Sequence, residues 1–492
     1  MIRATTFAGK TVAVFGLGGS GIAAAQSLVA GGAQVICWDD GEAGRARAEA
    51  AALEVCDLKA ADWSKISSLV LAPGVPLTHP RPHWTVELAK GRNVEIIGDV
   101  EIFARERAAH APDAPFIAIT GTNGKSTTTA LTAHLLSHLG FDVQMGGNIG
   151  RAILTLEPPA PNRIHVVEMS SYQIDLTPTL SPSIAVLLNI TPDHIDRHGT
   201  LAHYAAVKER LLADADACAV GIDDSLTASA ANRVSPSERL YAFTAGQGAR
   251  AIPRLYAIGQ SLFVHELAGA YASSEQIASL EAIGSLRGRH NVQNALAALT
   301  AIRALDDLAT AGKAALRNMN DAGEKTVWLP PRLADGLQSF PGLPHRLEQV
   351  GRAGRVLFIN DSKATNAEAT EKALASFDGG IHWIAGGQPK SGGIASLETL
   401  FPRIAKAYLI GAAEAEFAET LQGKVAYERC GTLQTALAMA AGDAAASDAA
   451  EPVVLLSPAC ASFDQFKNFE DRGDAFRQMA QEIVGKGGDE CR

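Results

Sequence analysis

The sequence predicts an α/β protein built from three successive domains. Its 492 residues are enough for about three domains at ~150 residues each. Short apolar runs alternate with Ala-rich helical stretches, which is the βαβ pattern of a parallel sheet. This pattern is interrupted and begins again twice along the chain. We therefore expect Rossmann-like domains at both ends and a central α/β domain between them.

The first series of elements extends to about residue 110. Its expected strands are Thr11–Phe15, Gln34–Trp38, Leu69–Leu71 and Val94–Ile97, and its expected helix is Gly21–Ala30. The segment that follows, His110–Pro115, has the Pro-rich, polar composition of a linker.

The second series begins directly after this linker. A strand at Phe116–Thr120 leads through a Gly-containing loop into a helix at Ser126–Leu139. Its later elements are strands at His165–Glu168 and Ile184–Asn189 and a helix at Asn291–Leu305. Residues 306–344 mix Gly, Pro and charge, so we expect an exposed insertion or linker there.

The third series occupies the last part of the chain. Its expected strands are Val356–Ile359, His382–Ala385, Ala407–Ile410 and Val453–Leu456. The three series predict domain boundaries that give residues 1–110, 111–338 and 339–492.

Composition and charge exclude several classes of protein. Hydrophobic residues make up 47% and charged residues 20%, as in a soluble globular protein. The net charge is -10 and no Lys/Arg run stands out, so we expect neither a nucleic-acid partner nor a membrane surface. No apolar stretch of ~18 residues predicts a membrane span. The six cysteines form no C-x-x-C pair, which fits a reducing, cytoplasmic location.

The strongest chemical signal is the loop between the strand Phe116–Thr120 and the next helix. It reads T-G-T-N-G-K-S from Thr120 to Ser126. Backbone N–H groups of such a loop cradle phosphates, the lysine reaches the β- and γ-phosphates, and the serine hydroxyl can ligate Mg²⁺. Ile119 stands where the full Walker pattern has its first Gly. An ordinary strand–helix turn is the alternative, but Gly-Lys-Ser in this context favours a phosphate loop.

Two further polar clusters follow neighbouring strands. Glu168 ends the run V-V-E, and Asp193 and His194 follow the run A-V-L-L-N-I. Ligands of open parallel sheets bind outside the carboxyl ends of the strands. We therefore expect Lys125, Glu168 and His194 to converge, and a carboxylate and an imidazole beside a phosphate loop suit Mg²⁺. A capping or salt-bridged role for Glu168 is the alternative.

The first series also contains a dinucleotide-binding fingerprint. Gly16 to Gly21 reads G-L-G-G-S-G after a strand, and Asp39 ends the next strand. Taken alone, this pattern predicts an NAD-dependent oxidoreductase.

The chain resembles the Mur ligase family, which joins amino acids to nucleotide-linked carboxylates. The motifs that carry the resemblance are G-T-N-G-K-S, V-E-M-S-S-Y-Q, N-I-T-P-D-H-I-D-R-H, G-R-H-N-V-Q-N-A, L-P-H-R-L-E and N-D-S-K-A-T-N. The run L-S-P-A-C-A-S-F-D-Q-F-K-N-F-E-D-R-G is similar to that of the members which add D-glutamate. The resemblance covers essentially the whole chain.

The resemblance implies a reaction and its substrates. ATP would phosphorylate the carboxylate of UDP-N-acetylmuramoyl-L-alanine, and the amine of D-glutamate would attack the acyl phosphate. It implies two Mg²⁺ ions, a cytoplasmic step of peptidoglycan precursor synthesis and a monomer. The three domains would bind the UDP substrate, ATP, and the amino acid with part of the nucleotide, respectively. The segment from Asp306 to Leu333 is longer than this family needs between its second and third domains.

The resemblance also implies roles for individual residues. Lys125, His194 and Lys208 would be catalytic, with Lys208 carbamylated, and Ser126, Glu168, His194 and Lys208 would hold metal. The implied ATP contacts are Gly121, Thr122, Asn123, Gly124, Lys125, Ser126, Thr127, Asn291, Arg346, Asp361, Lys363 and Thr365. The implied UDP-substrate contacts are Gly18, Ser20, Asp39, Gly74 and Asn148. The implied D-glutamate contacts are Lys390, Ser462 and Phe469. Without the resemblance, Lys208 is a helix-surface lysine.

Three alternatives remain open at this point. The first is a sister amide ligase, either another member of the family or a folylpolyglutamate synthetase. The second is a nicotinamide oxidoreductase, which tight NAD(H) binding would support. The third is a nucleotide-binding switch, which would bind ATP without substrate-dependent phosphate release.

Overall fold

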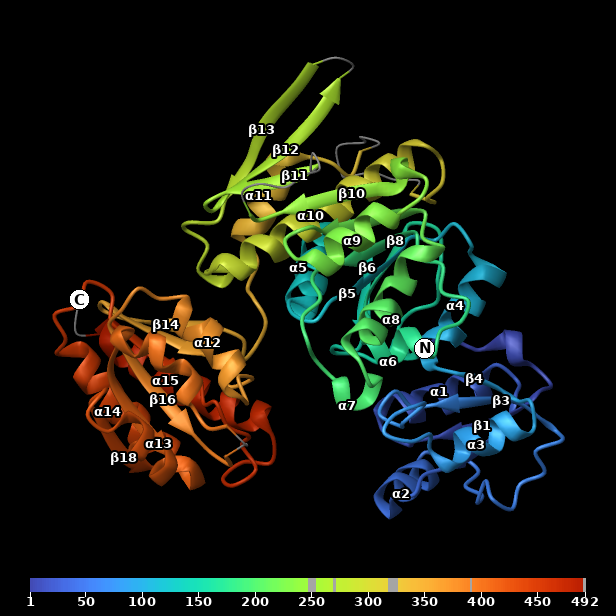
Figure 1. The fold of residues 1–492 in the computed structure, drawn as a ribbon, viewed down its shortest axis with the longest axis horizontal. Coiled ribbons are helices and arrows are strands. Elements are labelled where there is room, and N and C mark those ends of the chain that lie inside the picture. Colours follow the sequence, from blue (N-terminus) through green and yellow to red (C-terminus); the bar gives the residue numbers. More distant parts are fainter. Residues whose placement is uncertain (247–253, 269–270, 317–325, 390–391, 490–492) are drawn as a thin grey trace. The chain divides into compact units, whose positions relative to one another are not determined.

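The computed structural model describes the chain except residues 247–253, 269–270, 317–325, 390–391 and 490–492 (Figure 1). The chain forms two compact units. The first unit contains residues 1–280 and 292–340, and the second contains residues 281–291 and 341–492. The first unit holds two sheets and the second unit holds one. This architecture confirms the α/β class, while the division into three domains at residues 110 and 338 stays a prediction.

The N-terminal sheet consists of parallel strands in the order β2-β1-β3-β4. Their bounds are Gln34–Trp38, Thr11–Phe15, Ile66–Leu71 and Glu95–Ile97. Helices cover both faces, so β1 is apolar on both: Val12 and Val14 enter one core and Ala13 and Phe15 the other. The first of these cores includes α1 (Gly19–Ala30) and α4 (Asp99–His110), and the second includes α3 (Trp84–Gly91).

The central sheet has the order β13-β12-β11-β10-β9-β8-β5-β7-β6. In this order its strands are Tyr271–Ser279, Ser261–Ala268, Leu255–Ile258, Leu240–Thr244, Ala217–Gly221, Ile184–Leu187, Phe116–Thr120, Arg163–Glu168 and Asp142–Gly147. The strands from β6 to β11 are parallel, and β12 and β13 continue antiparallel. The antiparallel extension was not expected from the sequence. A continuous apolar core joins this sheet to the N-terminal one, with Phe103 of α4 packed edge-on against Phe116 of β5.

The prediction of an exposed linker at residues 306–344 is wrong for much of that segment. Helix α10 spans Arg289–Thr310 and α11 spans Pro330–Gln338, with Leu333 and Leu337 fully buried. The buried Asp306 carboxylate accepts hydrogen bonds from the backbone N–H groups of Val327 and Trp328, at 2.7 and 3.2 Å. Asp306, which lies in the segment that the sequence predicts to be exposed, therefore binds the backbone of residues 327 and 328.

The sheet of the second unit has the order β14-β15-β19-β16-β17-β18. Its strands in this order are Glu348–Ala353, Val356–Asn360, Val453–Leu456, Ile381–Gly386, Ile404–Ile410 and Tyr427–Gly431. All pairs are parallel except β14 with β15. Two apolar cores lie on its two faces, and Leu357 and Phe358 of β15 point to different ones. In the described part of the chain, no helix is both long and apolar enough to cross a bilayer.

We predict that Asp306→Ala lowers the free energy of unfolding of the first unit by about 1–3 kcal/mol, because it leaves buried backbone donors without an acceptor. Chemical denaturation followed by circular dichroism measures the change. Glu49→Ala, at an exposed position of α2 (Glu42–Ala50), is the control and should change stability by less than about 0.5 kcal/mol. Equal stability of Asp306→Ala and the control would contradict this role of Asp306.

Candidate functional site

The loop after β5 has the backbone geometry of a phosphate loop. Gly124 has φ +83° and is the N-cap of α5 (Lys125–His138), where no side chain caps the helix. A Cβ at Gly124 would lie 2.2 Å from Oδ1 of Asn294, and one at Gly121 would lie 2.8 Å from Cβ of Leu188. Both glycines are therefore required by close packing, and α5 begins directly after the loop that follows β5.

Lys125 folds back over this loop. Its Nζ donates to the carbonyl oxygens of Gly121 at 3.1 Å and Thr122 at 2.9 Å. An ammonium group therefore lies beside the N-terminus of a helix of 14 residues. The helix dipole and the lysine favour the same ligand, an anion such as a phosphate.

Lys208 of α8 (Leu201–Ala213) contacts the same loop. The interpretation of this residue as a surface lysine, which the sequence gives without the resemblance, is therefore wrong. Lys208 is 1% exposed. Its Nζ donates to the Gly121 carbonyl at 2.9 Å and lies 3.2 Å from Oγ1 of Thr120. Burial, and then the charge of Lys125, hold the pKa of Lys208 well below its usual value, while Asp193 and Glu168 act in the opposite direction. This environment favours a neutral amine.

Glu168 ends β7 and is 2% exposed. Its Oε1 accepts a hydrogen bond from Nδ2 of Asn148 at 2.8 Å, and the Asn148 backbone N–H donates to the Glu168 carbonyl at 2.9 Å. Its Oε2 is buried and has no hydrogen-bond partner among the described residues. A buried carboxylate oxygen without a donor suits a cation, since such an atom is otherwise costly to desolvate.

His194 lies on a loop that is tied to the phosphate loop. It has φ +51° and is the N-cap of α7 (Ile195–His198), and its ring is 3.4 Å from Asp193 and half exposed. Thr122 makes the tie: its Oγ1 donates to the Thr191 carbonyl at 3.1 Å and accepts from the Thr191 N–H at 3.0 Å. Among the described residues, no group of three or more His, Cys, Asp or Glu side chains is arranged to hold a metal. A metal bound here would need oxygen ligands from elsewhere.

Sequence reasoning missed the aromatic residues that hold these loops. The Tyr204 hydroxyl lies 3.1 Å from Oγ1 of Thr122, and the Lys208 ammonium lies 4.8 Å from the Tyr204 ring centre. His198 is 3% exposed, stacks on Tyr172 and lies 2.9 Å from Oγ of Ser171, and burial lowers its pKa to about 4. The spacing of Tyr204 and Lys208, four residues apart on one helix, is the signal that could have found the tyrosine.

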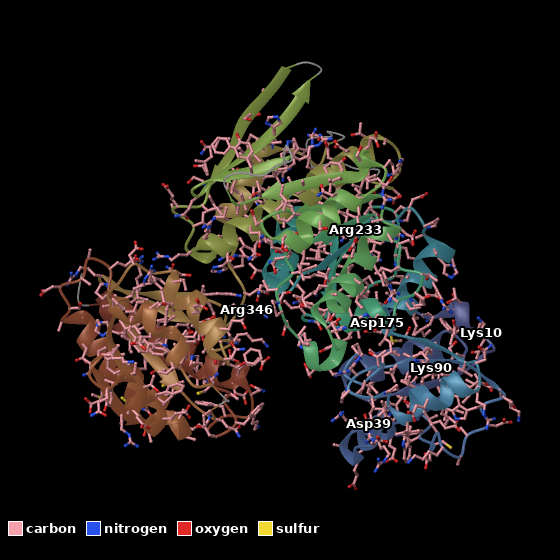
Figure 2. All side chains as sticks on the ribbon, viewed as in Figure 1. Lys10, Asp39, Lys90, Asp175, Arg233 and Arg346 are labelled. Atoms are coloured by element: carbon pink, nitrogen blue, oxygen red, sulfur yellow. The ribbon has the colours of Figure 1, made fainter. Side chains whose placement is uncertain are left out.

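In the N-terminal fingerprint, the carboxylate of Asp39 accepts hydrogen bonds from the protein's own backbone. Asp39, labelled in Figure 2, accepts from the Leu17 N–H at 2.6 Å through Oδ2 and from the Gly41 N–H at 2.8 Å through Oδ1. Oδ2 therefore shapes the loop whose Gly18 is the N-cap of α1, and Oδ1 shapes the loop after β2. Ser20 lies in the first turn of α1. The Gly74 carbonyl accepts from Arg197 of α7 at 3.0 Å, which joins this domain to the His194 loop.

In the second unit, several predicted residues meet at the carboxyl ends of β15 and β19. Asp361 is buried, accepts from Oγ of Ser457 at 2.8 Å and from the Leu347 N–H at 3.1 Å, and its burial raises its pKa to about 7. The Lys363 ammonium lies 3.8 Å from the centre of the Phe469 ring. The N–H of Thr365 donates to the Lys363 carbonyl at 2.8 Å.

The remaining predicted residues of the second unit have different surroundings. Arg346 lies on the loop before β14 (Figure 2). Asn291 is buried and its Nδ2 donates to the Arg287 carbonyl at 2.9 Å. Ser462 is buried, but the stretch to Phe469 is not helical, because α15 begins at Phe469. Lys390 lies outside the described residues.

Comparison with known proteins places most of the chain within family models. Residues 119–302 match the Mur ligase middle domain, and residues 345–460 match the Mur ligase, glutamate ligase domain. The chain is 57% identical over 488 residues to the UDP-N-acetylmuramoylalanine–D-glutamate ligase of Mesorhizobium japonicum, covering 99% of this chain and 98% of that protein. It is 55% identical over 490 residues to the ligase of the same name from Brucella abortus, with the same two shares.

Solved structures share the fold at low sequence identity. UDP-N-acetylmuramate-alanine ligase MurC of Thermotoga maritima has a TM-score of 0.55 at 18% identity, covering 96% of this chain and 99% of that chain. MurF ligase of Thermotoga maritima, in complex with ADP, has a TM-score of 0.53 at 16% identity, covering 99% and 97%. These neighbours support the α/β architecture alone.

We predict that Tyr204→Phe weakens ATP binding roughly two- to tenfold, because it removes one hydrogen bond that holds Thr122 in the phosphate loop. Isothermal titration calorimetry measures the affinity. Tyr256→Phe is the matched control, since Tyr256 lies on β11 and stacks on Phe263. ATP affinity unchanged in Tyr204→Phe, at unchanged melting temperature, would show that this hydroxyl does not support the loop.

Proposed function

The chain belongs to the Mur ligase family, and we propose that it adds D-glutamate to UDP-N-acetylmuramoyl-L-alanine at the expense of ATP. The observation that carries the proposal is the similarity to ligases of that name, which extends over 99% of the chain at 55–57% identity. It supports this member of the family over a sister ligase. It also speaks against the oxidoreductase that the N-terminal fingerprint alone suggested. The reaction belongs to peptidoglycan precursor synthesis, which we assign to the cytoplasm.

The proposed reaction has two steps. The γ-phosphoryl group of ATP passes to the carboxylate of UDP-N-acetylmuramoyl-L-alanine, giving an acyl phosphate and ADP. The amine of D-glutamate then attacks the acyl carbon, the amide bond forms and phosphate leaves. Positioning and charge neutralisation dominate such phosphoryl transfer. We assign these tasks to the loop Gly121–Thr127, with Lys125 contacting the transferred group.

Mg²⁺ fits the residues near this loop. The unpartnered Oε2 of Glu168 is a hard oxygen donor, and Ser126 and His194 are the further protein ligands that we propose. When bound with ATP, Mg²⁺ would neutralise charge on the phosphate oxygens. Because the described side chains supply few acidic ligands together, phosphate oxygens and water would complete the coordination.

Lys208 is the proposed site of a carbamate. A neutral amine attacks carbon dioxide, forms an N–C bond and releases a proton, and burial favours the neutral amine at this position. The product replaces this buried amine by an anion beside Lys125 and would be a further oxygen ligand for metal.

The remaining assignments follow the parts of the fold. The proposed contacts of the UDP substrate are Gly18, Ser20, Asp39, Gly74 and Asn148. Asp39 would act by holding the Leu17 and Gly41 N–H groups in place. The proposed contacts of the nucleotide are Asn291, Arg346, Asp361, Lys363 and Thr365. Ser462 and Phe469, with Lys390, are proposed to serve D-glutamate.

The decisive experiment is phosphate release from ATP, measured with UDP-N-acetylmuramoyl-L-alanine and a panel of D- and L-amino acids. We expect turnover with D-glutamate and little with L-glutamate or D-glutamine. Preference for another amino acid would assign the chain to a sister ligase. ATP binding without acceptor-dependent release would support the nucleotide-binding switch.

We predict that Lys125→Ala lowers kcat by roughly 10²–10³-fold, because it removes a cation placed for the transferred phosphoryl group. A coupled phosphate-release assay measures the rate. Lys90→Ala is the control, since Lys90 is an exposed lysine at the end of α3 (Figure 2). A folded Lys125→Ala enzyme with the rate of the control would contradict the assignment.

We predict that Lys208 carries a carbamate in the active enzyme. Carbon-13 NMR in labelled bicarbonate should show one slowly exchanging carbamate signal that is missing in Lys208→Ala. That variant should lose most activity, and short carboxylic acids should restore part of it. Full activity in enzyme depleted of carbon dioxide, with no such signal, would exclude the modification.

We predict that the fingerprint Gly16–Gly21 binds the UDP substrate and not a dinucleotide. Calorimetry should give saturable heat with UDP-N-acetylmuramoyl-L-alanine and none with NAD⁺ or NADH at the same concentrations. Micromolar NAD⁺ affinity would overturn this assignment.

A further inference from the structure

The second unit contains a fully buried guanidinium group. Arg472, on α15 (Phe469–Asp489), is 1% exposed. Its Nε donates to Oγ of Ser362 at 3.0 Å, and its Nη2 donates to the Ser362 carbonyl at 2.9 Å and the Cys460 carbonyl at 3.1 Å. Its Nη1 lies 3.4 Å from the Ala461 carbonyl oxygen. All four of these acceptors are neutral oxygens.

The groups around Arg472 come from the carboxyl ends of three adjacent parallel strands. Ser362 follows β15, Cys460 follows β19, and Gly387 follows β16, in the sheet order β15-β19-β16. A Cβ at Gly387 would lie 3.1 Å from Nη1 of Arg472 and 2.4 Å from the Ala461 carbonyl oxygen. Arg472 therefore fixes the loops after β15 and β19 by hydrogen bonds. The loop after β16 is joined to the loop after β19 by the Gln388 N–H, which donates to the Ala461 carbonyl at 2.9 Å. These loops lie at the sheet edge where α/β folds bind ligands.

The positive charge of Arg472 has no ion-pair partner among the described residues. The carboxylate of Asp464 acts on its pKa without an ion pair, and its Oδ2 accepts from the Ala412 N–H at 3.0 Å. Burial lowers the pKa of Arg472 to about 10. A buried charge that is bonded only to neutral groups raises the local potential, and an anion bound nearby would compensate it.

Two of the proposed D-glutamate contacts, Ser462 and Phe469, lie next to groups that Arg472 contacts. Ser462 follows Ala461 in the chain, and Phe469 lies three residues before Arg472. The Ser362 hydroxyl, which accepts from Nε, donates to the Phe469 carbonyl at 2.8 Å. The Phe469 ring in turn lies against the Lys363 ammonium.

We propose that Arg472 is a positioning residue that makes the acceptor site selective for an amino acid with a side-chain carboxylate. It fixes the positions of Ser462 and Phe469 through its contacts with Ala461 and Ser362, and its charge raises the potential felt by that carboxylate. The inference rests on the proposed function, because it takes D-glutamate as the acceptor.

The two contributions are separable by substitution. Arg472→Lys keeps a cation but loses the planar fork that bonds the loops after β15 and β19, whereas Arg472→Met loses both. Arg477→Met is the matched control on the same helix, because Arg477 donates to Glu348 at 2.7 Å and to neither of these loops in the contacts described. Each purified full-length variant is assayed for melting temperature, for KM of D-glutamate and of ATP, and for its rate ratio of D-glutamate to D-glutamine.

We expect KM for D-glutamate to rise at least about tenfold in Arg472→Lys and further in Arg472→Met, with KM for ATP within about twofold of wild type. Arg472→Lys should keep part of the preference for D-glutamate over D-glutamine, and Arg472→Met should lose most of it. The control should keep both KM values. Equal increases in both KM values, or an unchanged preference in Arg472→Met, would overturn the proposal.

Folding failure and failure of the proposed function have separate outcomes. If neither Arg472 variant folds, Ser362→Ala removes the hydroxyl that links Nε to the Phe469 carbonyl and should raise KM for D-glutamate alone. If that variant folds with normal KM, or also fails to fold, Arg472 is structural and the proposal is wrong. If wild type does not use D-glutamate in the parallel assay, the proposed function itself fails.

Discussion

The Nζ atom of Lys208 donates to the Gly121 carbonyl at 2.9 Å from inside the protein. This contact constrains much of the first unit's site. The amine can be buried because it donates hydrogen bonds to oxygens of the strand β5 and of the loop that follows it. These hydrogen bonds require that loop to stay close to α8. Tyr204 and Thr122 tie the same two elements together. The Gly121 carbonyl thus accepts hydrogen bonds from both Lys125 and Lys208.

The second unit uses the same arrangement with a different residue. Arg472 donates only to neutral oxygens at the ends of β15 and β19, as Lys208 does at the end of β5. In both units a buried basic side chain therefore holds loops at the carboxyl ends of parallel strands, where α/β folds bind ligands. In the second unit, the charge of Arg472 also raises the local positive potential without an exposed basic patch.

The sequence predicted those features that local pattern determines. The strands Thr11–Phe15, Phe116–Thr120 and Val453–Leu456 have the expected bounds, because continuous apolar runs mark strands buried on both faces. The strand Tyr271–Ser279 was missed, because an antiparallel edge strand does not need a continuous apolar run. The burial of Lys208, Asp306 and Arg472 was missed for another reason. It depends on which element packs over each residue, and local spacing does not contain that information.

Buried cations also explain how an acidic chain can hold anionic substrates. The net charge of -10 gives a repulsive mean field for nucleotides and dicarboxylates at long range, which salt screens within about 10 Å. A cation in a low-dielectric interior acts over short distances with much greater strength than one on the surface. Arg472 therefore needs no basic surroundings. The glycine spacing of the N-terminal fingerprint does not by itself identify a dinucleotide ligand. Both carboxylate oxygens of Asp39 already accept hydrogen bonds from backbone N–H groups of Leu17 and Gly41. The ligand there is decided by the residues that surround the loop, not by the glycine spacing.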